Sequence, residues 1–147
     1  MSTGGWLYGY LFVPDEYDPV EWTSIVLKVG CSKYPERRWY ELVERQGYRR
    51  DGWSLHLTWK YQVPTGVNRY WLEAALIEVL DPNEFGVGLS EREGFWCDAM
   101  WNPCPDETRS RLTRITDVCL KHLDHRPRKN PKRREWTLAV RDEAFDA

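Results

Sequence analysis

Side chains that can act on a phosphate group are spread over four short motifs in the first two-thirds of the chain. An aromatic segment contains two tyrosines, a second segment ends in Lys-Val-Gly, a Pro-Glu-Arg-Arg sequence follows, and an apolar stretch contains one glutamate. A guanidinium fits phosphate oxygens, a carboxylate can bind a hydrated Mg²⁺ ion, and a phenol can transfer a proton. Each residue alone is typical of a solvated surface, so only the ordered set indicates phosphate chemistry. The set comprises Tyr8, Tyr10, Lys28, Arg38 and Glu73.

The order of these motifs resembles that of the GIY-YIG nuclease superfamily. The likeness is to the branch of phages, bacteria and fungi whose second motif reads Lys-Ile-Gly and is followed by a polar turn and Pro-Glu-Arg-Arg. Residues 28–38 read KVGCSKYPERR here. The family's arginine falls on Arg38, and its glutamate, which lies on a later helix, falls on Glu73. Residues 93–96 (EGFW) resemble the glycine–aromatic segment of the branch, and the likeness covers residues 5–98.

The resemblance implies a metal-dependent endonuclease that hydrolyses the phosphodiester bonds of DNA. In this family one Mg²⁺ or Mn²⁺ ion is held by a single carboxylate and several waters, a role that would fall to Glu73. Arg38 would neutralise the phosphate, and a strand tyrosine would take the proton of the attacking water. Lys28 replaces the tyrosine of the family's second motif, which removes one hydroxyl and supplies a cation that could hold phosphate.

Two tyrosines compete for the role of general base. Tyr8 fits the first motif best, because residues 5–8 (GWLY) follow its Gly-x-[Ile/Val]-Tyr form. The alternative register, residues 9–12 (GYLF), would place Phe12 at this position, and a phenylalanine cannot accept a proton. Tyr8 and Tyr10 share one strand face, so both could line the site.

Hydrophobic patterns predict an α+β fold with a small, mostly antiparallel three-stranded sheet, flanking helices and an extra C-terminal helix. The clearest strand pattern is the alternation of apolar and polar residues after Ser54, and Asn68 is expected to cap the helix that follows. We predict a nuclease-like unit at residues 1–100 and a C-terminal part at residues 101–147 packed on the same domain. The predicted strands span residues 6–13, 24–30 and 54–63, and the predicted helices span residues 35–44, 69–80 and 107–123.

A basic run occupies residues 126–134, with six basic residues and two prolines. Its composition predicts neither strand nor helix, and it is either a solvated linker or an arm that binds phosphates. Together with the first arginine of the Pro-Glu-Arg-Arg motif, this run supplies the candidate nucleic-acid contacts. These are Arg37, Arg126, Arg128, Lys129, Lys132, Arg133 and Arg134.

Bulk properties restrict the class of protein. The net charge is −2 over 147 residues, which argues against coating of DNA through overall positive charge. The sequence has neither a signal-peptide pattern nor a run of membrane-spanning length, so we expect a soluble, cytoplasmic protein with reduced cysteines. Zinc is an alternative to a buried cysteine and surface histidines, with Cys97, Cys104, Cys119, His122 and His125 as candidate ligands.

Three functions therefore stay open. The first is an active DNA endonuclease, possibly encoded by a phage or mobile element. The second is an inactive module of the same fold that binds nucleic acid, and the third is one that binds a protein partner, for example as an anti-defence factor. The acidic pI and the extra aromatic residues favour the binding modules over a free-standing nuclease. The acids of segment 14–23 would repel a DNA backbone if they faced the cleft.

Overall fold

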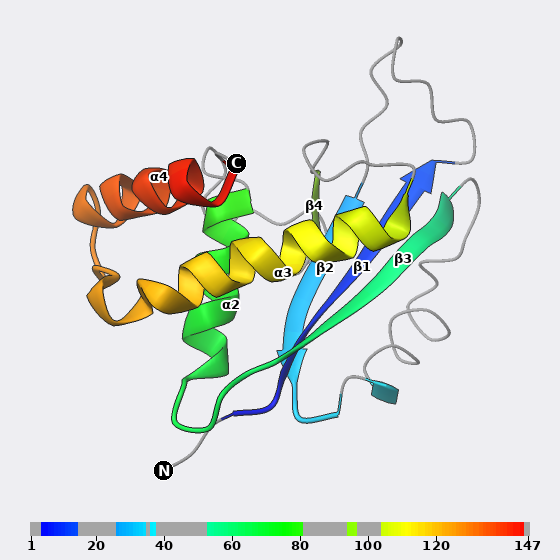
Figure 1. Ribbon diagram of the computed structural model, residues 1–147, viewed down its shortest axis with the longest axis horizontal. Coiled ribbons are helices and arrows are strands. Elements are labelled where there is room, and N and C mark those ends of the chain that lie inside the picture. The colour runs from blue at the N-terminus through cyan, green and yellow to red at the C-terminus, as the bar shows by residue number, and fades with distance from the viewer. Residues whose placement is uncertain are drawn as a thin grey trace, which may run out of the picture.

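The computed structural model describes residues 4–14, 26–34, 36–37, 53–80, 94–96 and 104–145 (Figure 1). It confirms the predicted α+β fold class, because an antiparallel sheet packs against helices. The helix predicted at residues 35–44 is helical at positions 36 and 37. The rest of that helix, including Arg38, lies outside the described residues.

The sheet has the strand order β3-β1-β2-β4, and every neighbouring pair is antiparallel. The three predicted strands are β1 (Trp6–Pro14), β2 (Val26–Ser32) and β3 (Trp53–Gln62). A short fourth strand, β4 (Gly94–Trp96), adds to the outer edge of β2. β1 is an inner strand between β3 and β2, and its aromatic residues favour extended backbone.

Alternation along the strands gives the sheet two different faces. One face carries Leu7 and Leu11 of β1 with Leu27, Val29 and Trp59, which belong to the hydrophobic core. We call it the core face. The opposite face carries the two candidate tyrosines and Lys28, and we call it the tyrosine face.

Two helices cover the core face. Helix α2 (Arg69–Leu80) packs against β1 and β2, and α3 (Pro105–Lys121) packs against β3. The predicted cap of α2 is confirmed, because Asn68 Oδ1 accepts hydrogen bonds from the backbone N–H groups of residues 70 and 71. Helix α3 begins two residues before the predicted start at Glu107, since Pro105 suits a first helical turn.

The prediction for the basic run was wrong over its last residues. Helix α4 spans Lys132–Phe145 and packs against α2 and α3, so Lys132, Arg133 and Arg134 form its first turn. A proline excludes helix only around its own position, and Pro131 directly precedes the helix, where its missing N–H is not needed. The C-terminal part thus contains two long helices instead of one, separated by the short 3₁₀ turn η3 (Leu123–His125).

Candidate active site

The tyrosine face brings together three of the five predicted catalytic residues. The ring centroids of Tyr8 and Tyr10 lie 5.2 Å apart on β1. Lys28 lies directly opposite Tyr10 in the β1–β2 register. All three side chains are buried, with exposed fractions of 1% for Tyr8, 4% for Tyr10 and 1% for Lys28. Tyr8 and Tyr10 thus share one strand face, as their spacing predicts, and the β1–β2 register adds Lys28 to it.

Gly30 determines where the ring of Tyr8 lies. The two residues are paired across β1 and β2, and a Cβ atom at Gly30 would overlap the hydroxyl and ring atoms of Tyr8. The phenol therefore crosses from β1 onto β2 through the space that a side chain at this position would fill. The Lys-Val-Gly motif contains this glycine, but nothing in the sequence shows that it makes room for Tyr8.

The first turns of α2 lie at the end of the sheet where β1 begins and β2 ends. The side chain of Arg69 lies beside Gly5 and the carbonyl of Ser32, since a Cβ at Gly5 would be 3.1 Å from Arg69 Cδ and 3.2 Å from that oxygen. Glu73 follows one helical turn later on the same side of α2 and is half-buried.

The sheet separates Glu73 from the tyrosines. Helix α2 packs on the core face, whereas Tyr8 and Tyr10 lie on the tyrosine face. β4 pairs with β2 only at Val26, Leu27 and Lys28, so no described strand borders the outer edge of β2 at Gly30.

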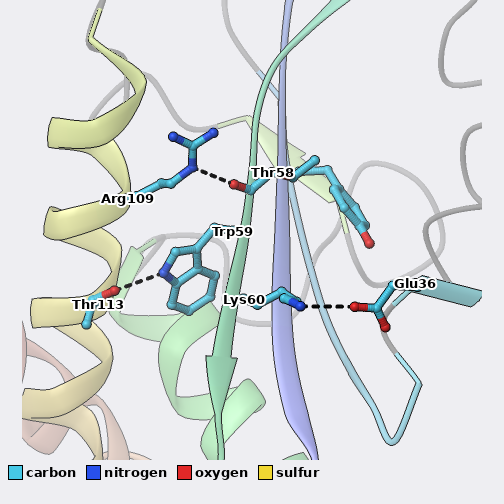
Figure 2. Close-up of a pocket in the computed structure, with 7 residues that line it drawn as sticks. Glu36, Thr58, Trp59, Lys60, Arg109 and Thr113 are labelled. Carbon is cyan, nitrogen blue, oxygen red and sulfur yellow. Dashed lines mark hydrogen bonds and ion pairs between the residues drawn. The ribbon is translucent and has the colours of Figure 1, made fainter.

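A cavity of about 590 Å³ adjoins Tyr10 at the edge strand β3 (Figure 2). Three interactions shape it. The Nε of Arg109 donates to the carbonyl of Thr58 at 2.8 Å. The Nε1 of Trp59 donates to Thr113 Oγ1 at 3.0 Å, so α3 closes one side of the cavity. Lys60 Nζ forms an ion pair of 3.0 Å with Glu36 on the other side.

The charges of this cavity nearly cancel. Lys60 pairs with Glu36, and the hydrogen bond from Lys60 lowers the pKa of the Glu36 carboxyl. Arg109 pairs with Asp106 at 2.8 Å. The cavity therefore offers room and polar groups beside Tyr10 without the excess positive charge that would attract a polyanion. Apart from Tyr10, none of the residues that line it belongs to the site residues predicted from the sequence.

The predicted nucleic-acid contacts divide into buried and exposed side chains. Arg126 is buried and forms an ion pair of 3.0 Å with Glu78 of α2, and Arg133 lies 3.3 Å from the same carboxylate. The basic run is thus not a uniformly solvated segment. Its exposed cations are Arg128, Lys129, Lys132 and Arg134, and Arg37 is also exposed, with its guanidinium 5.9 Å from the centroid of the Tyr34 ring.

The suggested zinc ligands are not gathered in one place. Cys104 precedes α3 and is exposed, whereas Cys119 is buried near its other end, about 22 Å away at 1.5 Å per residue. One ion cannot bind both thiols. His122 forms an ion pair of 3.0 Å with Glu143. Cys97 lies outside the described residues, among which no three His, Cys, Asp or Glu side chains form a possible metal cluster.

We expect Cys119 to resist thiol reagents in the folded protein. Burial raises the pKa of its thiol to about 12, so almost no thiolate is present at pH 8. Cys104 is exposed and provides the internal comparison. Peptide mapping after iodoacetamide treatment at pH 8 should show Cys104 labelled at least ~100-fold faster, with Cys119 reacting only after unfolding. Equal labelling rates would contradict the buried position of Cys119.

The resemblance to the GIY-YIG superfamily rests on the sequence motifs alone. No family model, no curated protein and no solved structure matches this chain. No helix in the described part of the chain combines the length and apolar composition needed to cross a membrane.

Proposed function

We propose that this protein is a metal-dependent endonuclease of the GIY-YIG type that cuts DNA in the cytoplasm. One observation carries the proposal: the paired strands β1 and β2 bring Tyr8, Tyr10 and Lys28 together, with the Tyr8 phenol lying over Gly30 of the second motif. Motifs that are separate in the sequence thus meet on one face of the sheet. The same end of β2 lies against the helix that carries Glu73.

The donor groups suit a hard, largely hydrated ion better than a protein-enclosed metal. The described residues offer one half-buried carboxylate, Glu73, in place of a cluster of acids. Mg²⁺ keeps several waters and is commonly held by one or two carboxylates together with substrate phosphate. When bound, such an ion would polarise the phosphate and stabilise the leaving oxygen.

The side chains of this chain would supply the remaining functions. Tyr8 would take the proton of the attacking water, and its hydroxyl lies over Gly30 of the second motif. Lys28 would favour the phenolate form and the bound phosphate through its positive charge. Arg38, as the family's arginine, would neutralise the phosphate from outside the described residues.

Plasmid nicking tests the proposal. Purified protein should convert supercoiled DNA to the nicked form in Mg²⁺ or Mn²⁺ and not in EDTA. Tyr8→Phe should slow this reaction by about 10²–10³-fold through loss of the proton acceptor, while Tyr10→Phe should slow it less than tenfold. A normal rate for Tyr8→Phe together with a large loss for Tyr10→Phe would move the base to Tyr10.

Gly30→Ala gives an independent test of the position of Tyr8. The added methyl group must displace the phenol, so we expect a loss of cutting similar to that of Tyr8→Phe. The double variant should lose no more than either single one, because both changes remove the same hydroxyl from the site. Thermal unfolding of each variant separates displacement from unfolding, and strictly additive losses in folded variants would contradict this role of Gly30.

A binding module without cutting activity is the second candidate. The paired charges beside Tyr10 and the net charge of −2 favour it, because neither concentrates positive charge at the site. DNA binding that weakens with salt, with no cleavage in Mg²⁺, Mn²⁺, Co²⁺ or Ni²⁺, would support this alternative over the nuclease.

A further inference from the structure

A second cavity, of about 420 Å³, lies between the start of α2 and the segment that follows α3. Asn68 and Trp71 line it from α2, and Asp124, Arg126 and Arg128 line it from the other side. Neither the tyrosine face nor the nuclease motifs contribute to it. We call it the Arg126 cavity.

Arg126 has unused hydrogen-bond donors although it is 5% exposed. Its Nη2 forms the ion pair with Glu78, and its guanidinium lies 4.0 Å from the centroid of the Trp71 ring. The buried Nε and Nη1 donate no hydrogen bond to any residue that the structure describes. Buried guanidinium donors without acceptors are costly, so such groups normally have a partner.

The charge around Arg126 is also unbalanced. Glu78 is 7% exposed and is shared between Arg126 and Arg133, so one carboxylate faces two guanidiniums. Arg128 adds a third cation at the rim, with its guanidinium 5.6 Å from the centroid of the Trp71 ring. Asp124 is exposed and supplies the only acid among these cavity residues, which leaves the local charge positive.

The start of α2 contributes a favourable dipole. This helix has 12 residues, and its capping residue Asn68 lines the cavity. The positive end of the helix dipole therefore points toward the same space as Arg126. Helix starts with neighbouring arginines are suited to phosphate groups, because guanidinium N–H pairs match phosphate oxygens.

We propose that the Arg126 cavity binds a phosphate group, carried either by a nucleic-acid backbone or by a small phosphorylated molecule. The phosphate oxygens accept hydrogen bonds from Nε and Nη1 of Arg126 once the buried guanidinium turns toward the cavity, and Arg128 closes over the phosphate from the rim. The positive charge left by the shared Glu78 is then neutralised. This site does not depend on the proposed cutting activity, so each can fail without the other.

Side-chain NMR of arginine reports on the unused donor directly. The full ¹⁵N-labelled chain is titrated with inorganic phosphate in EDTA at constant ionic strength, with sodium chloride as the reference. The Nε–Hε signal of Arg126, assigned with Arg126→Lys, should move in a saturable way with phosphate and not with chloride. A signal that stays in place, or that moves equally with both salts, would overturn the proposal.

Exposed rim variants test the site without disturbing the buried ion pairs. Arg128→Gln should weaken phosphate binding about tenfold, the effect of one lost charge-assisted hydrogen bond. Asp124→Asn should tighten it by roughly threefold by removing a nearby negative charge. Arg134→Gln removes the same charge from the same run outside the cavity and should change affinity less than twofold. If Arg128→Gln and Arg134→Gln weaken phosphate binding equally, the effect comes from overall charge and the proposed site is wrong.

Two further titrations identify the source of the phosphate. A 12-nucleotide single-stranded DNA that displaces inorganic phosphate from Arg126 and binds at least tenfold more tightly would assign the cavity to a nucleic-acid backbone. A mononucleotide that binds more tightly than this DNA would assign it to a small phosphorylated ligand. Either result supports the phosphate site, whereas binding of the DNA without any change in the Arg126 signal places the DNA elsewhere and contradicts the first assignment.

Discussion

Glu73→Gln is expected to reduce metal-dependent nicking of plasmid DNA by about 10²–10³-fold, the loss typical of removing a principal electrostatic group from an active site. Glutamine keeps the shape of the side chain but provides no negative charge for a divalent ion. Glu73 is half-buried on α2, next to the core residues Leu72 and Leu76, so its position is held by packing. The expected defect therefore reports on metal binding and not on a displaced side chain.

A matched substitution distinguishes loss of the metal ligand from the loss of any one negative charge. Glu135→Gln makes the same change at an exposed position of α4 and should leave nicking within twofold of the native rate. Both variants should unfold at temperatures close to that of the native protein. If folded Glu73→Gln cuts as fast as Glu135→Gln, Glu73 is not the metal ligand. If the native protein also fails to cut in any divalent ion, the nuclease proposal itself is wrong.

Sequence patterns predicted the strands and helices whose formation depends on residues close together in the chain. The alternation at Leu57 and Trp59, the aromatic strand with Tyr8 and Tyr10, and the Asn68 cap each reflect preferences that act within a few residues. The position of Lys28 opposite Tyr10 depends on the strand register, which the sequence did not predict. β4 was missed because three residues are too few to produce a periodic pattern.

Long-range pairing is what the sequence could not show. Arg126 and Arg133 belong to a run whose composition predicts solvation, yet both lie within ion-pair distance of Glu78 on another helix. Lysine and arginine are almost never fully buried unless paired, and the partner becomes known only when the helices are packed. Gly30 is similar, since its packing against Tyr8 depends on the strand register.

Glu78→Gln should destabilise the protein by about 3–5 kcal/mol, the usual cost of leaving a buried charge without its partner. The carboxylate accepts contacts from Arg126 at 3.0 Å and from Arg133 at 3.3 Å, which links α2 to both the segment after α3 and helix α4. Burial of Arg126 lowers the pKa of its guanidinium, and Glu78 opposes this shift. Without Glu78 the burial cost is uncompensated, so chemical unfolding in phosphate-free buffer should begin at lower urea concentration.

A double substitution distinguishes a lost ion pair from a lost residue of the core. In Glu78→Leu combined with Arg126→Met, both charges are replaced by apolar groups, so neither is left buried alone. Such replacements are often close to neutral, and we expect the double variant to be more stable than Glu78→Gln. Glu135→Gln, on the exposed side of α4, should change stability by less than about 0.5 kcal/mol. A Glu78→Gln protein as stable as Glu135→Gln would mean that Arg126 does not depend on Glu78, and would contradict this role of the ion pair.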